Sequence, residues 1–295
     1  MKSRWIQLSL VWCAFPALLP AQDVARRFAP FRPGGDTLVA IAFVQPATGR
    51  SAWLGADVRV HAASTMKVPV LIELARRVDA GELAWSDSLP VVNDFLSIAD
   101  GSHFTVDPAD DSDPLPYTFI GGKMTVEELA RRMTVRSSNL ATNILIGRLD
   151  ARRVTATARL LGADSIDVLR GVEDGAAFQR GMNNTLTARG LATLLQALLT
   201  GKAASAAGTQ RILGMLASQE FNDGIPAGLK AGTLVAHKTG WITAIAHDAA
   251  IVYPADAPPY VLVVLTRGYG TEPDAEAVMR KIAAEAERIA ATRSR

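Results

Sequence analysis

The chain has 295 residues, and 49% of them are hydrophobic, which is enough for one large domain or two small ones with a substantial core. It carries 31 basic and 29 acidic residues, a formal net charge of +2. The first 21 residues hold two of the basic residues and no acid, so the remaining charges balance at 29 against 29. This balance excludes the broad basic surface of a nucleic-acid-binding protein.

The N-terminus predicts a secretory signal peptide over residues 1–21. Two basic residues precede an apolar run from Trp5 to Leu19, and Ala21 supplies a small residue at the expected cleavage point. A signal anchor is the alternative, but the run is short and interrupted by proline. The only cysteine, Cys13, lies inside this segment, so the mature chain would have no disulfide. We therefore expect an exported protein, periplasmic or extracellular, without a stable membrane span.

Residues 22–295 predict a single domain in which strands come first and last and helices fill the middle. Alternating or continuous apolar runs predict strands at 38–44, 51–54, 234–238, 249–253 and 260–266. Helical periodicity predicts helices at 63–78, 125–135, 140–149, 151–161, 187–199, 211–216 and 273–291.

Antiparallel hairpins at the two ends of such a chain can join into one sheet. The predicted fold class is therefore α/β (α+β), with a five-stranded antiparallel sheet flanked by the end helices. The sheet lobe would comprise residues 22–63 and 225–295, and residues 64–224 would form an all-helical lobe. A cleft between two such lobes is a common place for an active site.

The segment from Leu83 to Tyr117 is irregular, with four prolines and an acidic cluster. The cluster consists of Asp107, Asp110, Asp111 and Asp113. Calcium binding is one interpretation, but the spacing follows no known metal loop. A solvated acidic loop is the interpretation that we favour.

The most informative stretch is Ser64-Thr65-Met66-Lys67, at the start of the helix predicted over 63–78. Lys67 lies one helical turn after Ser64, on the same face. A serine hydroxyl needs a nearby base, and a lysine amine can serve if burial lowers its pKa. The motif thus indicates a Ser-Lys acylating centre. Taken alone, the motif favours the alternative of a capping serine followed by a solvated lysine.

Two further motifs follow in order, Ser137-Ser138-Asn139 between two predicted helices and Lys238-Thr239-Gly240 at the end of a predicted strand. Together with Ser64-x-x-Lys67, they resemble the three-part signature of the penicillin-recognising serine enzymes. Asn143 matches a later asparagine of the middle motif, and residues 247–252 resemble the strand after the third. The similarity covers essentially the whole mature chain and is greatest to class A β-lactamases.

The resemblance implies a catalytic role for several residues. Ser64 would be the acylated nucleophile, and Lys67 would be its base or proton relay. Ser137 would pass a proton to the departing ring nitrogen, and Asn139 would hydrogen-bond the amide side chain of the substrate. The resemblance implies no cofactor and no metal.

The third motif would bind substrate. Lys238 and Thr239 would hold its carboxylate, because a cation and a hydroxyl suit an anionic group. Gly240 would keep the strand approachable. The backbone N–H groups of Ser64 and Trp241 would form the oxyanion hole. The alternative is that Lys238 is a solvated lysine at a strand end, and that Asn139 and Asn143 merely begin a helix.

The chain departs from the family pattern next to two of the three motifs. Ser138 stands where the family has an aspartate, so the loop must be held differently. His237 precedes the third motif, but the other histidines show no zinc-ligand spacing relative to it.

The third departure concerns deacylation. Class A β-lactamases activate water with the glutamate of an R-x-E-x-x-L-N loop, whereas this chain places Glu173 three residues after Arg170 and has no matching asparagine. Glu173 is either the general base or a residue that only forms a salt bridge in the loop. Arg170 would pin this loop through an ion pair, and Asp174 is the nearest substitute base.

We therefore expect a monomeric serine hydrolase that is acylated by β-lactams at Ser64 and then hydrolyses the acyl-enzyme. Its partner would be a small-molecule β-lactam or a cell-wall peptide. A D-alanyl-D-alanine peptidase would share every acylating residue. A β-lactam sensor that stays acylated is a third possibility.

Overall fold

The computed structural model describes residues 21–292. The predicted signal peptide, including Cys13, lies outside the described residues except for Ala21, which begins helix α1 (Ala21–Phe28). Within the described part of the chain, no helix is both long enough and apolar enough to cross a membrane.

The structure confirms the five-stranded antiparallel sheet, with strand order β2-β1-β11-β10-β9. The first and last hairpins join where β1 pairs with β11, for example Ile41 with Val264. The strands are β1 (Leu38–Gln45), β2 (Arg50–Leu54), β9 (Leu234–Ile242), β10 (Ile245–Tyr253) and β11 (Tyr260–Arg267). Strand β9 runs four residues beyond its predicted end, so the Lys238-Thr239-Gly240 motif lies inside the strand and not at its end.

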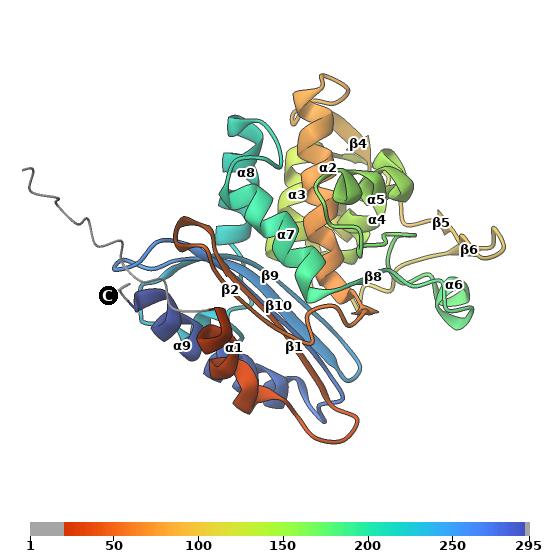
Figure 1. Cartoon of the computed structure of the whole chain (residues 1–295). Coiled ribbons are helices and arrows are strands. Elements are labelled where there is room, and N and C mark those ends of the chain that lie inside the picture. The colour runs from red at the N-terminus through yellow and green to blue at the C-terminus, as the bar shows by residue number, and fades with distance from the viewer. Residues whose placement is uncertain (1–20, 293–295) are drawn as a thin grey trace, which may run out of the picture.

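Each face of the sheet is covered by helices, which explains why the strands are continuous apolar runs (Figure 1). The larger side chains of β1, including Ile41 and Phe43, pack on α1 and the C-terminal helix α9 (Glu272–Ala291). Its smaller side chains, Ala40 and Ala42, face the helical part of the molecule. Small residues on this face allow the helices to approach the sheet closely.

The helical part lies on the opposite side of the sheet from α1 and α9, with α2 at its centre (Figure 1). Its helices are η3 (Ala63–Met66, a 3₁₀ turn), α2 (Lys67–Asp79), α3 (Val126–Val135), α4 (Asn139–Leu149), α5 (Ala151–Leu160), α6 (Gly175–Gln179), α7 (Ala188–Leu199) and α8 (Ala206–Ala217). Side-chain caps begin several of them, as Thr125 does for α3 and Thr187 for α7. The prediction for α8 was too short, because its first turn lacks apolar periodicity.

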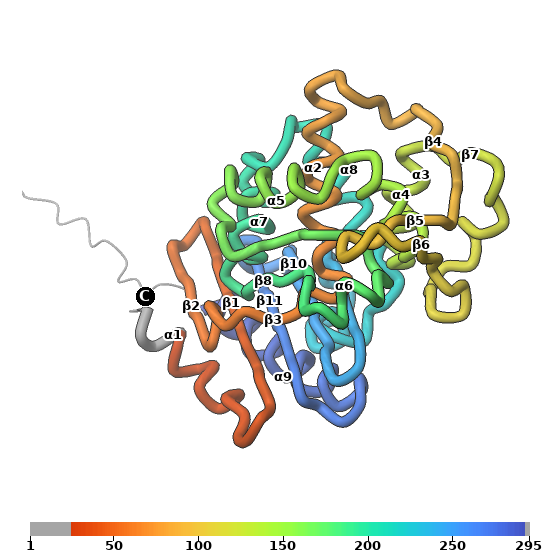
Figure 2. Tube along the Cα trace, turned by 90° about the vertical axis from the view of Figure 1, so that its right-hand side faces the viewer, coloured from red at the N-terminus to blue at the C-terminus, as the bar shows by residue number. Residues whose placement is uncertain are grey.

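Short strands and 3₁₀ turns fill the irregular segments. The strand pairs are β3 (Val60–His61) with β8 (Thr185–Leu186), β4 (Ser88–Pro90) with β7 (Lys123–Thr125), and β5 (Phe95–Leu96) with β6 (His103–Phe104). The β5–β6 hairpin lies beside α6 (Figure 2), and the Ser97 hydroxyl donates to Asp174 across this contact (2.7 Å).

The interpretation of the acidic cluster as a solvated loop is wrong for two of its four members. Asp107 and Asp110 are exposed, but Asp111 and Asp113 are buried. Both buried carboxylates receive hydrogen bonds, which offsets the cost of removing them from water.

Candidate active site

The predicted nucleophile lies on the 3₁₀ turn η3, directly before α2. Ala63, which precedes Ser64, has a left-handed φ of 44°, a conformation that costs a non-glycine residue about 1–3 kcal/mol. Its N–H donates to Nδ1 of His61 (3.0 Å). Burial and the nearby Arg170 lower the pKa of His61, which keeps Nδ1 available as an acceptor. The turn that presents Ser64 is therefore fixed by a specific contact.

Lys67 begins α2 and is buried, with three oxygens around its amine. Its Nζ donates to the Ser137 carbonyl (2.5 Å), to Ser137 Oγ (3.2 Å) and to Asn139 Oδ1 (2.9 Å). Burial lowers the pKa of Lys67 to about 7, although the carboxylates of Asp111 and Glu173 oppose the change. A lysine of this kind is partly neutral at physiological pH and can accept a proton.

Lys238, on β9, reaches the same serine from the other side. Its Nζ donates to Ser137 Oγ (3.0 Å) and to the Thr239 carbonyl (2.9 Å). Burial and the nearby Lys67 amine lower the pKa of Lys238 well below its usual range. Two lysine amines therefore meet at one hydroxyl. Ser137 itself has a left-handed φ of 60°, so two strained residues lie within this small region.

Strand β9 passes directly over the nucleophile turn, and Gly240 makes this possible. A Cβ at Gly240 would lie 2.5 Å from the Ser64 nitrogen and 2.8 Å from the Thr65 nitrogen. Both are backbone atoms, so no flexible side chain could move aside. Glycine is required here because of close backbone approach.

A cleft of about 380 Å³ opens beside Ser64. It is lined by residues from the nucleophile turn, the start of α4, the loop before α6 and the end of β9: His61, Ala63, Ser64, Asn139, Arg170, Val172, Glu173, Asp174, Gly175, Phe178, Asn184, Trp241, Ile242 and Thr243. The cleft thus brings four predicted site residues together, and Lys67 contacts one of them, Asn139.

Thr239 does not line this cleft. It borders a separate, much smaller cavity together with Asp248 and Met279. Its hydroxyl is buried and has no hydrogen-bond partner within the described residues. The buried pair of His237 and Asp248 (2.9 Å) lies on the same two strands. No group of three or more histidine, cysteine or acidic side chains in the described chain could hold a metal.

Glu173 lies in the loop between α5 and α6, at a left-handed φ of 62°. Its Oε1 accepts a hydrogen bond from Asn139 Nδ2 (3.1 Å), whose Oδ1 in turn accepts from Lys67. Burial and the nearby Asp110 raise the pKa of Glu173, against the opposing effect of Lys67 and Arg170. A single asparagine therefore connects the candidate base for deacylation to the candidate base for acylation.

The loop that carries Glu173 is clamped from α4. The Asn143 side chain accepts from the Val172 N–H (2.7 Å) and donates to the Val172 carbonyl (2.9 Å). Gly171 packs against the same amide, because a Cβ there would lie 2.3 Å from Asn143 Oδ1. Asn143 therefore positions the loop and does not merely begin a helix.

The prediction that Arg170 forms an ion pair is wrong. Its guanidinium donates instead to the carbonyls of Met182 and Gly171 and to the Asn183 side chain (2.9–3.1 Å), none of which is a carboxylate. Asp174 also lines the cleft, but its carboxylate is engaged by other groups. It caps α6 and binds Ser97 Oγ and the Ile98 N–H.

Comparison with known proteins places the chain in a family. The model of the beta-lactamase enzyme family matches residues 22–289. The chain belongs to this family. It is 30% identical to a beta-lactamase of Rhodobacter capsulatus over 67% of this chain and 64% of that protein, and 24% identical to beta-lactamase CTX-M-8 of Citrobacter amalonaticus over 93% and 90%. Its resemblance is to the class A β-lactamase-like serine hydrolases.

Solved structures of the β-lactamase fold superimpose over most of the chain. A beta-lactamase from Sphaerobacter thermophilus has a TM-score of 0.77 and 26% identity, with 92% of this chain and 98% of that chain covered. The protein PBP-A has a TM-score of 0.76 and 24% identity, covering 91% and 94%. The fold of this β-lactamase family member is therefore the one that the sequence predicted.

Sequence reasoning missed two residues that shape this β-lactamase-like site. His61 was considered only as a metal ligand, although its position three residues before Ser64 is a usable signal for a role in the nucleophile turn. Asp111 was assigned to a solvated loop, and it is instead buried against the start of α4. No local signal distinguishes it from its exposed neighbour Asp110.

Proposed function

We propose that this protein is a serine β-lactamase that hydrolyses β-lactams through an acyl-enzyme at Ser64. The observation that carries the proposal is the chain of contacts from Lys67 through Asn139 to Glu173. It couples a lysine amine able to accept a proton with a carboxylate in the cleft beside Ser64. The family's acylation chemistry needs the amine, and hydrolysis of the resulting ester needs the carboxylate.

In acylation, Ser64 Oγ attacks the lactam carbonyl while neutral Lys67 accepts the hydroxyl proton. The carbonyl oxygen becomes an oxyanion, which the backbone N–H groups of Ser64 and Trp241 would stabilise. The C–N bond of the ring then breaks. A proton reaches the departing nitrogen through Ser137 Oγ, which both Lys67 and Lys238 contact. The product of this step is an ester on Ser64 and a ring-opened amine.

In deacylation, Glu173 takes a proton from a water molecule, which attacks the ester carbonyl. The ester bond breaks, and the proton returns to Ser64 Oγ. A pKa raised by burial gives Glu173 more basic strength than an ordinary carboxylate. This step separates a β-lactamase from a protein that remains acylated.

Substrate binding follows from the same residues. An incoming carboxylate would raise the pKa of Lys238 again, because an opposite charge favours the protonated amine. Asn139 would hydrogen-bond the amide side chain of the substrate. We propose no such direct role for the Thr239 hydroxyl in the geometry described, since it borders a different cavity.

A D-alanyl-D-alanine peptidase is the second candidate. It is favoured by the departure of the Glu173 loop from the family pattern R-x-E-x-x-L-N. A solved variant of PBP-A, an acyl-enzyme complex with penicillin G, has the same fold at 24% identity. A likeness at this level concerns the fold alone, so it does not choose between the two activities.

Turnover assays separate the candidates. We expect the wild-type protein to hydrolyse many equivalents of a chromogenic cephalosporin and to leave a D-alanyl-D-alanine peptide uncleaved. Ser64→Ala should lose the activity by about 10⁴-fold or more, as when other serine nucleophiles are removed. Peptide cleavage without cephalosporin turnover would support the peptidase. Unimpaired turnover by Ser64→Ala would remove Ser64 from the mechanism.

We also propose that the protein is exported and acts as a monomer. The support for export is the sequence of residues 1–21, with its basic start and apolar run. Fractionation of cells that express the full chain, followed by size-exclusion chromatography with light scattering, tests both statements.

A further inference from the structure

A buried carboxylate lies at the start of α4, where the second motif begins. Oδ2 of Asp111 accepts hydrogen bonds from the backbone N–H groups of Asn139 and Leu140 (2.9 Å each) and from the Tyr117 hydroxyl (2.9 Å). The Ser138 hydroxyl lies 3.3 Å from the same oxygen. A negative charge at this end of a helix is stabilised by the free N–H groups and by the helix dipole.

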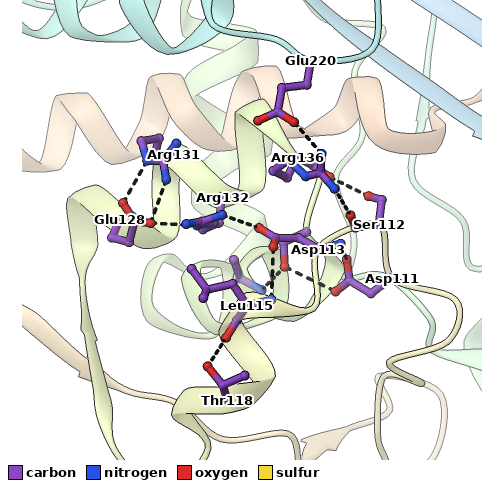
Figure 3. Close-up of polar contacts among 12 residues, drawn as sticks. Asp111, Ser112, Asp113, Leu115, Thr118, Glu128, Arg131, Arg132, Arg136 and Glu220 are labelled. Atoms are coloured by element: carbon purple, nitrogen blue, oxygen red, sulfur yellow. Dashed lines mark hydrogen bonds and ion pairs between the residues drawn. The ribbon is translucent and has the colours of Figure 1, made fainter.

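The loop that brings Asp111 to this place is itself firmly held (Figure 3). Asp111 Oδ1 accepts from the Asp113 N–H (3.1 Å), and Asp113 pairs with Arg132 (3.5 Å). The Ser112 hydroxyl donates to the Arg136 carbonyl (2.5 Å), and the Arg136 guanidinium donates back to the Ser112 carbonyl (3.1 Å). Helix α3 and its C-cap residue Arg136 therefore fix the two residues that follow Asp111.

Lys67 contacts Asn139, which this carboxylate holds, and Ser137, two residues earlier in the same motif. Ser137 keeps a strained backbone conformation, and Asn139 bridges Lys67 and Glu173. Strain of this size persists only where surrounding contacts over-determine the conformation. Asp111 supplies three such contacts at the residues that follow Ser137: the Ser138 hydroxyl and the N–H groups of Asn139 and Leu140.

We propose that Asp111 replaces, from a preceding loop, the aspartate that other family members carry in the second motif at the position of Ser138. Asp111 is a positioning residue, since it holds residues 138–140 next to Ser137 and does not line the cleft. The inference rests on the proposed function only for its kinetic consequences. Its structural part does not depend on the proposed function: position 111 or position 138 supplies a single carboxylate at the start of α4.

The geometry allows one carboxylate here and not two. Ser138 is fully buried, and its Oγ already lies 3.3 Å from Asp111 Oδ2. An aspartate at position 138 would place two negative charges in contact, which destabilises both. The two positions are therefore alternatives, and this exclusivity is testable as a double-mutant cycle.

The cycle uses Asp111→Asn, Ser138→Asp and the double variant, with Asp113→Asn as a control in the same loop. We expect Asp111→Asn to slow acylation by penicillin G about 10- to 100-fold, the usual effect of displacing reacting groups by up to about 1 Å. It should also lower Tm by about 5 °C. Ser138→Asp alone should lower Tm as well. The double variant should recover most of the Tm and acylate within about threefold of wild type.

A pH profile adds a readout that a purely structural role would not move. Lys67 faces the carboxylates of Asp111 and Glu173 and the Lys238 amine. Removing the Asp111 charge lowers the pKa of Lys67 further, so the acid limb of the acylation rate should move to lower pH in Asp111→Asn. Asp113→Asn should lower Tm without moving this limb, because Asp113 does not contact residues 137–139.

The inference is overturned if the effects of the two single substitutions simply combine in the double variant. Its Tm loss would then equal the sum of the two single losses, and its acylation rate would fall by the product of the two single factors. If Asp111→Asn does not fold, recovery of a folded double variant still supports the proposal, and failure of the double variant contradicts it. If wild-type protein is never acylated, the proposed function fails, whereas the Tm cycle continues to test Asp111.

Discussion

The residues proposed for acylation and the residue proposed for deacylation are held in place in different ways. The acylating residues lie on regular elements, with Lys67 at the start of α2, Ser137 just before α4 and Lys238 inside β9. Lys67, Ser137 and Lys238 are buried, and their polar atoms contact one another. Glu173 instead lies in an irregular loop, is partly exposed, and accepts one side-chain hydrogen bond, from Asn139.

This difference separates a part of the site that is fixed by the fold from a part that depends on loop contacts. The fixed part requires the start of α2 and strand β9 at the edge of the sheet, so changes there would affect stability and catalysis together. The loop part depends on the contact of Asn143 with Val172, which Gly171 makes room for, and on the hydrogen bonds of Arg170 to residues 182 and 183. Acylation and deacylation should therefore respond separately to mutation.

Among substitutions in the loop that carries Glu173, Glu173→Gln should have the largest effect on hydrolysis. This variant should still be acylated by penicillin G at a near-normal rate, while hydrolysis falls by about 10²–10⁴, the usual contribution of a general base. The acyl-enzyme should then accumulate, which stopped-flow acylation followed by intact-protein mass spectrometry detects. Glu127→Gln, which changes an exposed carboxylate on α3, is the matched control and should leave both steps unchanged. Rapid turnover by Glu173→Gln would show that another group deacylates the enzyme.

The acylating half is tested by Lys238→Ala. Loss of a charge-assisted contact to the substrate carboxylate should remove about 2–4 kcal/mol of transition-state stabilisation, or roughly 30- to 10³-fold in kcat/KM. The loss should shrink for a substrate whose carboxylate is esterified. Equal losses on the acid and on its ester would mean that Lys238 supports the fold and does not contact the ligand.

A smaller effect is expected from Gly171→Ala, which tests whether deacylation can be slowed without slowing acylation. The new Cβ would press on Asn143 Oδ1 and break its bonds to Val172, so the loop should shift. Deacylation should slow by about 10- to 100-fold, because misplacing the base by about 1 Å is costly. Acylation should remain within about twofold of wild type. An equal fall in both rates would contradict the separation of the halves.

The smallest effect is a shift in pH dependence in Asp110→Asn. The Asp110 charge helps to raise the pKa of Glu173, which must be ionised to act as a base. Removing that charge lowers the pKa, so the acid limb of deacylation should move to lower pH. The acid limb of acylation depends on Lys67 and should not move. Because Asp110 is exposed, the shift should diminish at high salt, and a shift in both limbs would contradict the assignment.

Much of the fold could be predicted from the sequence because its signals are local. Caps such as Thr125, the helical period after Ser64 and the apolar strands at both ends of the chain each depend on neighbouring residues. The end of β9 was predicted too early, because Trp241 and Ile242 continue to pair with β10 after Gly240.

The supports of the site could not be predicted in this way, because they are contacts between distant segments. Asp111 reaches Leu140 across 29 positions, and Asn143 reaches Val172 across 29 positions. Arg170 is charged, so an ion pair was the natural expectation, but folding places carbonyl and amide oxygens around it. Buried charges and loop anchors of this kind become visible only when the whole chain is folded.

The central claim is that a β-lactam passes through an ester on Ser64 and is then released by water. Rapid-quench mass spectrometry of the wild-type protein with an excess of penicillin G tests it most directly. The account predicts a transient adduct on the peptide that contains Ser64, which decays at the rate at which ring-opened product appears. An adduct that persists for hours without product, an adduct on another peptide, or product formation by Ser64→Ala would contradict it.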